Sequence, residues 1–123
     1  TPSSTLYSMT VGIHEYRGII SVSPVDKFVS ATGSSNLPNS GNMASTANAN
    51  DLIFGAFMQM SGANVVGNPG ANFSFRVDQP TSAVAEALYT EDRIVSSTAV
   101  YAANITLASS QSWRAVAVAL KGS

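Results

Sequence analysis

The chain has 123 residues, of which 45% are hydrophobic and 11% are charged; this length suits one domain with its own core, and the charged fraction lies well below the roughly 25% of typical soluble domains. The net charge is −1 and the six basic residues are scattered singly, so the sequence lacks the basic stripe that a nucleic acid or an acidic membrane surface would require. The absence of cysteine excludes disulfides, thiolate nucleophiles and cysteine-based zinc sites.

Short segments of alternating apolar residues, each bounded by turn residues, predict β-strands along most of the chain. In chain order, the predicted strands are residues 6–16, 27–32, 51–60, 73–77, 88–96, 100–107 and 113–120. A short apolar stretch covers 19–25, a long uncharged loop rich in asparagine fills 33–50, and a tight turn is expected at 67–70. Residues 81–87 tolerate a helix but are expected to form a loop or a single turn.

The distribution of apolar residues indicates where some of these strands lie in a sheet. Residues 27–32 form a short edge strand, whereas 51–60 and 113–120 are apolar on both faces and should be central and covered from two sides. Trp113 opens the last strand and is therefore expected to be buried. The fold class that follows is all-β: an antiparallel β-sandwich of Ig-like or jelly-roll type, with about seven strands and a single domain over residues 1–123.

Few residues are suited to catalysis. His14 is the only histidine, and the chain has no Gly-x-Ser-x-Gly turn, so nothing indicates a Ser-His nucleophile. A glycoside hydrolase needs two carboxylates across a cleft, and Glu15, Glu91 and Asp92 are the residues that can supply them.

The same carboxylates also have a structural interpretation. Glu15 shares a strand face with apolar residues, so its side chain should point toward the core and need a cationic partner. We therefore expect a structural ion pair, Glu15–Arg93 or Glu91–Arg76, and predict that the chain is not an enzyme.

Metal binding has one candidate pair of residues. No Asp-x-Asp-x-Asp run of the kind that binds calcium occurs in the chain. Glu91 and Asp92, together with loop carbonyls, are the candidate ligands for Ca²⁺, and no other metal or cofactor is predicted.

Carbohydrate binding requires exposed aromatic rings and side chains that hydrogen-bond hydroxyl groups. Tyr16 and Tyr89 lie at the ends of predicted strands, near loops, and are the candidate stacking residues. Asn36, Asn39 and Asn42 in the long loop are the candidate hydrogen-bonding residues.

Three distinctive segments occur together in the chain. They are residues 13–18, Ile-His-Glu-Tyr-Arg-Gly; residues 48–55, Asn-Ala-Asn-Asp-Leu-Ile-Phe-Gly; and residues 91–95, Glu-Asp-Arg-Ile-Val, with the closing segment 113–121. In this order and spacing they resemble a β-sandwich module repeated in large secreted or surface proteins of bacteria. The resemblance implies no known catalytic residues, and it implies further strands before residues 13–18.

These observations predict a secreted, non-catalytic binding or adhesion module with polysaccharide as the preferred ligand and a cell-surface molecule as the other kind of partner. The first alternative is a structural spacer or a self-assembling filament or surface-layer subunit, and the second is a small glycan-active hydrolase. The chain is also expected to be the C-terminal part of a larger sandwich. A companion segment, a neighbouring copy or a swapped partner would then supply the missing strands.

Overall fold

The computed structural model describes residues 10–59, 67–79 and 86–123. These residues form an all-β, antiparallel structure, as predicted, and none of them lies in a helix. The strands are β1 (Val25–Ser35), β2 (Asn50–Gln59), β3 (Gly67–Asn68), β4 (Ser74–Gln79), β5 (Ala87–Ser96), β6 (Thr106–Leu107) and β7 (Gln111–Lys121). Among the described residues, no helix is long and apolar enough to cross a membrane.

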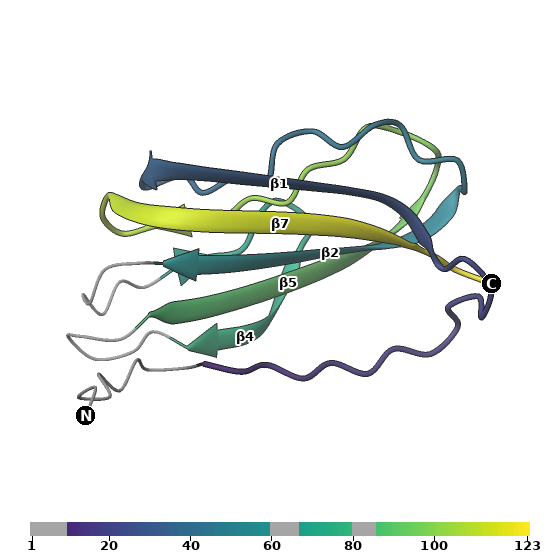
Figure 1. Cartoon of the computed structure of the whole chain (residues 1–123), viewed down its shortest axis with the longest axis horizontal. Coiled ribbons are helices and arrows are strands. Elements are labelled where there is room, and N and C mark those ends of the chain that lie inside the picture. The colour runs from purple at the N-terminus through teal and green to yellow at the C-terminus, as the bar shows by residue number, and fades with distance from the viewer. Residues whose placement is uncertain (1–9, 60–66, 80–85) are drawn as a thin grey trace, which may run out of the picture.

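Five strands form the main sheet in the order β1-β7-β2-β5-β4, and every neighbouring pair is antiparallel (Figure 1). Both β2 and β7 have a hydrogen-bonded strand on each side, which confirms the prediction that 51–60 and 113–120 are central. β1 lies at the edge, as predicted for 27–32, but extends further than expected, to Ser35.

The second layer is much less regular than the first. It contains the two-stranded pair β3–β6 and two extended segments, 36–46 and 99–107, joined by backbone hydrogen bonds such as Ser40 N–H to Ala103 O and Met43 N–H to Tyr101 O. The prediction of one continuous strand over 100–107 is therefore wrong for most of its length, since only Thr106–Leu107 is a strand.

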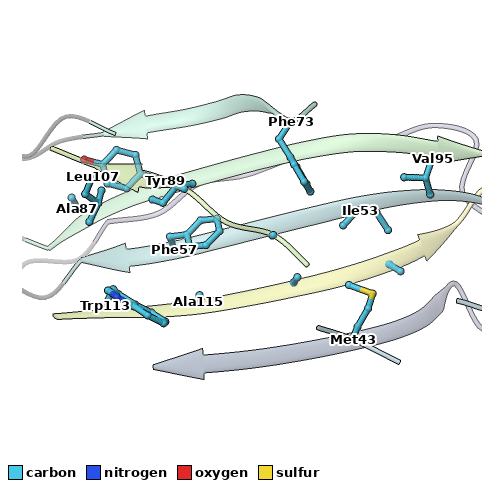
Figure 2. Packing of buried hydrophobic residues seen from close by; sticks show 14 residues of the cluster. Met43, Ile53, Phe57, Phe73, Ala87, Tyr89, Val95, Leu107, Trp113 and Ala115 are labelled. Atoms are coloured by element: carbon cyan, nitrogen blue, oxygen red, sulfur yellow. The ribbon is translucent and has the colours of Figure 1, made fainter. Parts of the chain in front are cut away.

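The core lies between the sheet and this second layer. Phe57, Tyr89 and Trp113 project from β2, β5 and β7 onto the same face, which we call the inner face (Figure 2). Trp113 is only 9% exposed, which confirms its predicted burial. The inner side of β7 otherwise carries alanines at 115, 117 and 119, and such small side chains allow the second layer to approach the sheet closely.

The first predicted strand is not observed. Residues 6–9 lie outside the described residues, and 10–16 are in no strand or bridge. Of the stretch 19–25, Val25 begins β1 and the rest forms no strand; Ile19 makes an isolated bridge with Gly122, the residue after β7. The turn expected at 67–70 is found at 70–73, where Phe73 N–H donates to Gly70 O. Of the helix-tolerant stretch 81–87, residues 81–85 lie outside the described residues.

Candidate functional site

The five-stranded sheet has an outer face, opposite to the core, that remains largely open. It carries Phe28 of β1, Val116 of β7, Met58 of β2 and Ile94 of β5, all of them exposed. Phe28 is 75% and Ile94 is 83% exposed. Half-buried valine and leucine side chains of β7 lie between them. Single exposed apolar residues are ordinary on protein surfaces, but a contiguous apolar face usually marks an interaction site.

A groove of about 510 Å³ crosses the outer face over β1, β7 and β2. Met58 and Val116 contribute apolar surface to it. Ser30, Thr32 and Arg114 add two hydroxyl groups and a guanidinium, and all three side chains are exposed. The groove therefore combines an apolar lining with polar groups that can hydrogen-bond a ligand.

Residues 10–17 run along the β4 side of the sheet (Figure 1). His14 and Tyr16 turn toward the outer face, where both rings contact Phe54 of β2, at centroid distances of 5.0 and 6.2 Å. Val11 and Ile13 point away and are exposed. Among the described residues, no backbone group of 11–16 takes part in a hydrogen bond. The segment thus alternates like a strand but lacks the ladder partner that a strand requires.

Tyr16 belongs to a hydrogen-bonded group on the outer face. Its hydroxyl donates to Asp92 Oδ2 at 2.6 Å, and Arg76 donates to the same carboxylate through Nε at 2.7 Å and Nη2 at 2.8 Å. Burial opposes the ionised form of Asp92, but the hydrogen bonds from Arg76 and Tyr16 outweigh it and lower the pKa of Asp92 below its ordinary value. Burial, followed by the hydrogen bond to Asp92, raises the pKa of Tyr16 above its ordinary value. Tyr16 is half-buried, so its ring is not an open stacking platform.

A hollow of about 360 Å³ lies beside this group, and His14, Phe54, Leu88 and Thr90 contribute to its lining. His14 Nε2 lies 3.2 Å from Thr90 Oγ1, which also accepts a hydrogen bond from Val77 N–H. Among the described residues, no carboxylate hydrogen-bonds the imidazole, so the orienting third member of a nucleophilic triad is missing there.

Both predicted ion pairs of Glu15 and Glu91 are wrong. Glu15 is exposed, and its only ionic contact among the described residues is with Arg17 at 3.9 Å. Arg93 instead lies over the rings of Phe73 and Tyr101, at 5.5 and 5.6 Å. The expectation failed because residues 10–16 lie on the outer face, so that the odd-numbered side chains point to solvent.

Arg76 pairs with Asp92 rather than with Glu91. Adjacent residues of a strand point to opposite faces, so a shift of one position transfers the ion pair from the inner to the outer face. Phe75 packs against the core and Arg76, the next residue, reaches the outer face by ordinary alternation. A bulge follows between Phe75 and Val77.

Glu91 connects the two layers on the inner face. Its carboxylate accepts hydrogen bonds from Gly70 N–H at 2.7 Å and from Asn104 N–H at 3.1 Å, and its side chain is fully buried. Burial raises the pKa of Glu91 to about 7, although both hydrogen bonds oppose this shift. Glu91 and Asp92 therefore lie on opposite sides of the sheet and do not meet around a single calcium ion. Calcium binding remains a prediction from the sequence alone.

The predicted sugar-binding residues do not form one site. Tyr89 is completely buried in the core, so its prediction as a stacking residue is wrong. Asn36, Asn39 and Asn42 are exposed on the second layer, across the sheet from Tyr16. Asn39 Oδ1 accepts a hydrogen bond from Gly41 N–H at 2.8 Å, the geometry of an ordinary Asx turn.

No family model, curated protein or solved structure matches this chain in comparisons with known proteins. The outer face is therefore the feature from which function must be argued. Sequence reasoning anticipated an uncovered face, because 51–60 and 113–120 are apolar on both sides and strands from elsewhere were expected to cover them. It did not single out Phe28 and Ile94, the most exposed apolar residues of that face.

Proposed function

We propose that this chain is a non-catalytic association module whose outer face packs against a further layer of β-structure from another segment or another copy. The observation that carries the proposal is the open apolar face itself. Phe28, Val116 and Ile94 are exposed on it, and Val11 and Ile13 extend the apolar surface along the neighbouring segment. Covering this surface would remove apolar area from water, and a strand added beside 11–16 would satisfy backbone groups there.

The non-catalytic part of the proposal is supported by the positions of the three carboxylates that a hydrolase would use. Glu91 lies on the inner face and Asp92 on the outer face, whereas Glu15 projects into solvent. Each of the two buried carboxylates is already hydrogen-bonded to groups that hold the fold together. A glycosidase needs two carboxyl groups that face one another across the substrate.

We further infer an Ig-like or jelly-roll sandwich in a secreted protein. The two antiparallel sheets support the sandwich fold. The polar but weakly charged composition, with 11% charged residues, supports secretion.

Polysaccharide binding is the second candidate, and the groove across β1, β7 and β2 is the observation that favours it. Ser30, Thr32 and Arg114 supply exposed polar groups beside its apolar lining, and such groups can hydrogen-bond sugar hydroxyls. The groove offers no exposed aromatic ring for stacking on a sugar: Phe57 contributes to its lining but is buried, and Phe28, although exposed, is not part of the lining. Association is therefore the preferred function of this face.

Sedimentation velocity over a range of concentrations tests the proposal. The parent chain should self-associate, or should bind a hydrophobic dye if its partner is a different segment, and Phe28→Ser with Val116→Ser should abolish both signals. Leu37→Ser is the matched control, because Leu37 is also an exposed apolar residue but lies in the second layer. A strictly monomeric parent that binds no dye would contradict the proposal. Retention on insoluble polysaccharide that Arg114→Ala abolishes would favour the second candidate instead.

A further inference from the structure

Two buried aspartates meet at the end of the sheet where β1 and β2 begin. The side chain of Asp26 is 2% exposed and Asp51 is 1% exposed. Asn48 joins them, because its backbone N–H donates to Asp26 Oδ2 at 2.9 Å and its side-chain Nδ2 donates to Asp51 Oδ1 at 2.9 Å. One loop residue thus contacts carboxylates from two strands that are separated in the sheet by β7.

The two carboxylates have very different sets of hydrogen-bond donors. Asp26 accepts from Ala47 N–H at 2.7 Å, from Asn48 N–H and from Lys27 Nζ at 3.0 Å. Asp51 accepts only from Asn48, and its Oδ2 is buried without a donor among the described residues. An ionised oxygen in that position would be costly. A protonated oxygen would instead be a donor, and the Asp26 carboxylate beside it is an acceptor.

The surrounding charges also favour a protonated Asp51 beside an ionised Asp26. Lys27 on β1 pairs with Asp26, while Lys121 on β7 acts on Asp51 from a distance and donates to Ser23 O. Burial is the largest influence and raises the pKa of Asp51; the Asp26 carboxylate raises it further, and Asn48 and Lys121 oppose the shift. Burial disfavours the ionised form of Asp26, but hydrogen bonds from Asn48, Lys27 and Ala47 lower its pKa to about 2.

We propose that Asp26 and Asp51 form an acid pair that shares one proton, carried by Asp51. Through this pair, hydrogen bonds connect β1, the loop before β2, and β2, and the strength of the connection depends on pH. Loss of the proton leaves two buried anions side by side and loosens this end of the sheet. The sign follows from linkage. The folded state holds a proton on Asp51 that the unfolded chain releases near pH 4, so the contribution of Asp51 is complete below about pH 4 and declines as the pH rises through its folded-state pKa. Asp26, whose pKa is lowered to about 2, contributes with the opposite sign: its part is present above about pH 4 and is lost on acidification.

Carbon-detected NMR of the aspartate carboxyl groups tests this inference directly. The Asp51 carboxyl carbon should titrate with a midpoint above the roughly 3.9 of an ordinary aspartate, and the Asp26 carbon should already show the ionised shift at that pH. An Asp51 carbon that titrates near pH 4, like an exposed aspartate, would overturn the proposal. This measurement uses the parent chain, so it is decisive even if a variant fails to fold.

Urea unfolding at several pH values gives a second test. Asp51→Asn keeps a donor toward Asp26 without a titrating proton, so its stability relative to the parent should rise with pH. Asp26→Asn should destabilise at every pH above about 4, because it removes the acceptor of three donors. Asp78→Asn, a change at an exposed aspartate of β4, is the matched control for replacing an aspartate by asparagine. A difference for Asp51→Asn that does not change with pH would refute the shared proton.

Discussion

The indole ring of Trp113 lies directly against Gly33, its cross-strand partner on β1. A Cβ atom at residue 33 would lie 2.5 Å from Trp113 Cζ2, which is closer than any carbon–carbon contact allows. The indole Nε1 also donates to Ser35 Oγ at 3.0 Å. The edge strand therefore positions the tryptophan in two ways: Gly33 leaves space for the indole ring, and the Ser35 hydroxyl accepts its N–H.

Gly33→Ala should destabilise the protein, because the added methyl group must displace the indole ring. Overpacking of this kind costs about 1–3 kcal/mol. Urea unfolding followed by the fluorescence of Trp113, the only tryptophan, measures the loss, and the emission of the folded variant should also shift. Ser34→Ala, a change at the neighbouring exposed residue, is the control. Equal stability of Gly33→Ala and the parent would show that the ring is not confined by β1.

Arg76→Met should destabilise by about 1–3 kcal/mol, the usual cost of leaving a buried charged group poorly satisfied. Asp92 is 4% exposed whereas Arg76 is about half-exposed, so the cost arises mainly from the carboxylate that is left behind. The pKa of Asp92 is lowered in the folded state, so its contribution exists above about pH 4 and is lost on acidification. The free energy of unfolding of the parent should therefore exceed that of Asp92→Asn by more at pH 7 than at pH 3. An advantage that is equal at both pH values would argue against the ion pair.

Glu91→Gln should change the pH dependence of stability. The folded-state pKa of about 7 exceeds the ordinary 4.5, so the parent should lose stability as the pH rises between these values, by roughly 1.4 kcal/mol for each unit of the shift that is realised. The glutamine variant lacks this slope but leaves one backbone N–H without an acceptor, at a cost of about 1–3 kcal/mol. The difference in free energy of unfolding between the parent and Glu91→Gln should therefore become smaller toward pH 8. A widening gap would contradict the prediction, and Glu15→Gln, at an exposed carboxylate, should leave the slope intact.

Ile94→Ala and Ile53→Ala form a matched pair on opposite faces of neighbouring strands. Ile53 is completely buried and Ile94 is exposed. The first change should lie within about 0.5 kcal/mol of the parent, whereas the second should cost about 2–5 kcal/mol. Chemical denaturation of dilute protein gives both values. A large loss for Ile94→Ala in dilute monomer would mean that the outer face is covered within the chain itself.

The strands that sequence reasoning located correctly are those whose burial is decided by their own residues. β2 and β7 are apolar on both faces, and this alone predicted their central positions. Trp113 was placed correctly for the same reason. The edge position of β1 was predicted from the short strand expected at 27–32, although the strand itself runs over Val25–Ser35.

The errors concern relationships between segments. Alternation in residues 10–16 predicted a strand, but it cannot say whether a ladder partner exists, so the side assigned to Glu15 was wrong. Arg76 lies on the face opposite Phe75, as alternation predicts, but its pairing with Glu91 was wrong because Glu91 points to the inner face and Asp92 to the outer one. Alternation within each strand cannot say which faces of two strands coincide. Asp26 and Asp51 are distant in sequence and meet only because β1 and β2 flank β7.

The strand order has a kinetic consequence. Among the strands of the main sheet, only β4 and β5 are both consecutive in the chain and paired; β7 must insert between β1 and β2, which are made long before it. During synthesis, the facing edges of β1 and β2 therefore remain without partners until the last strand emerges. Closure of such long loops slows folding and prolongs the exposure of edges that promote aggregation. A chaperone that shields nascent edges would thus act on this protein mainly in the interval before residues 111–121 leave the ribosome.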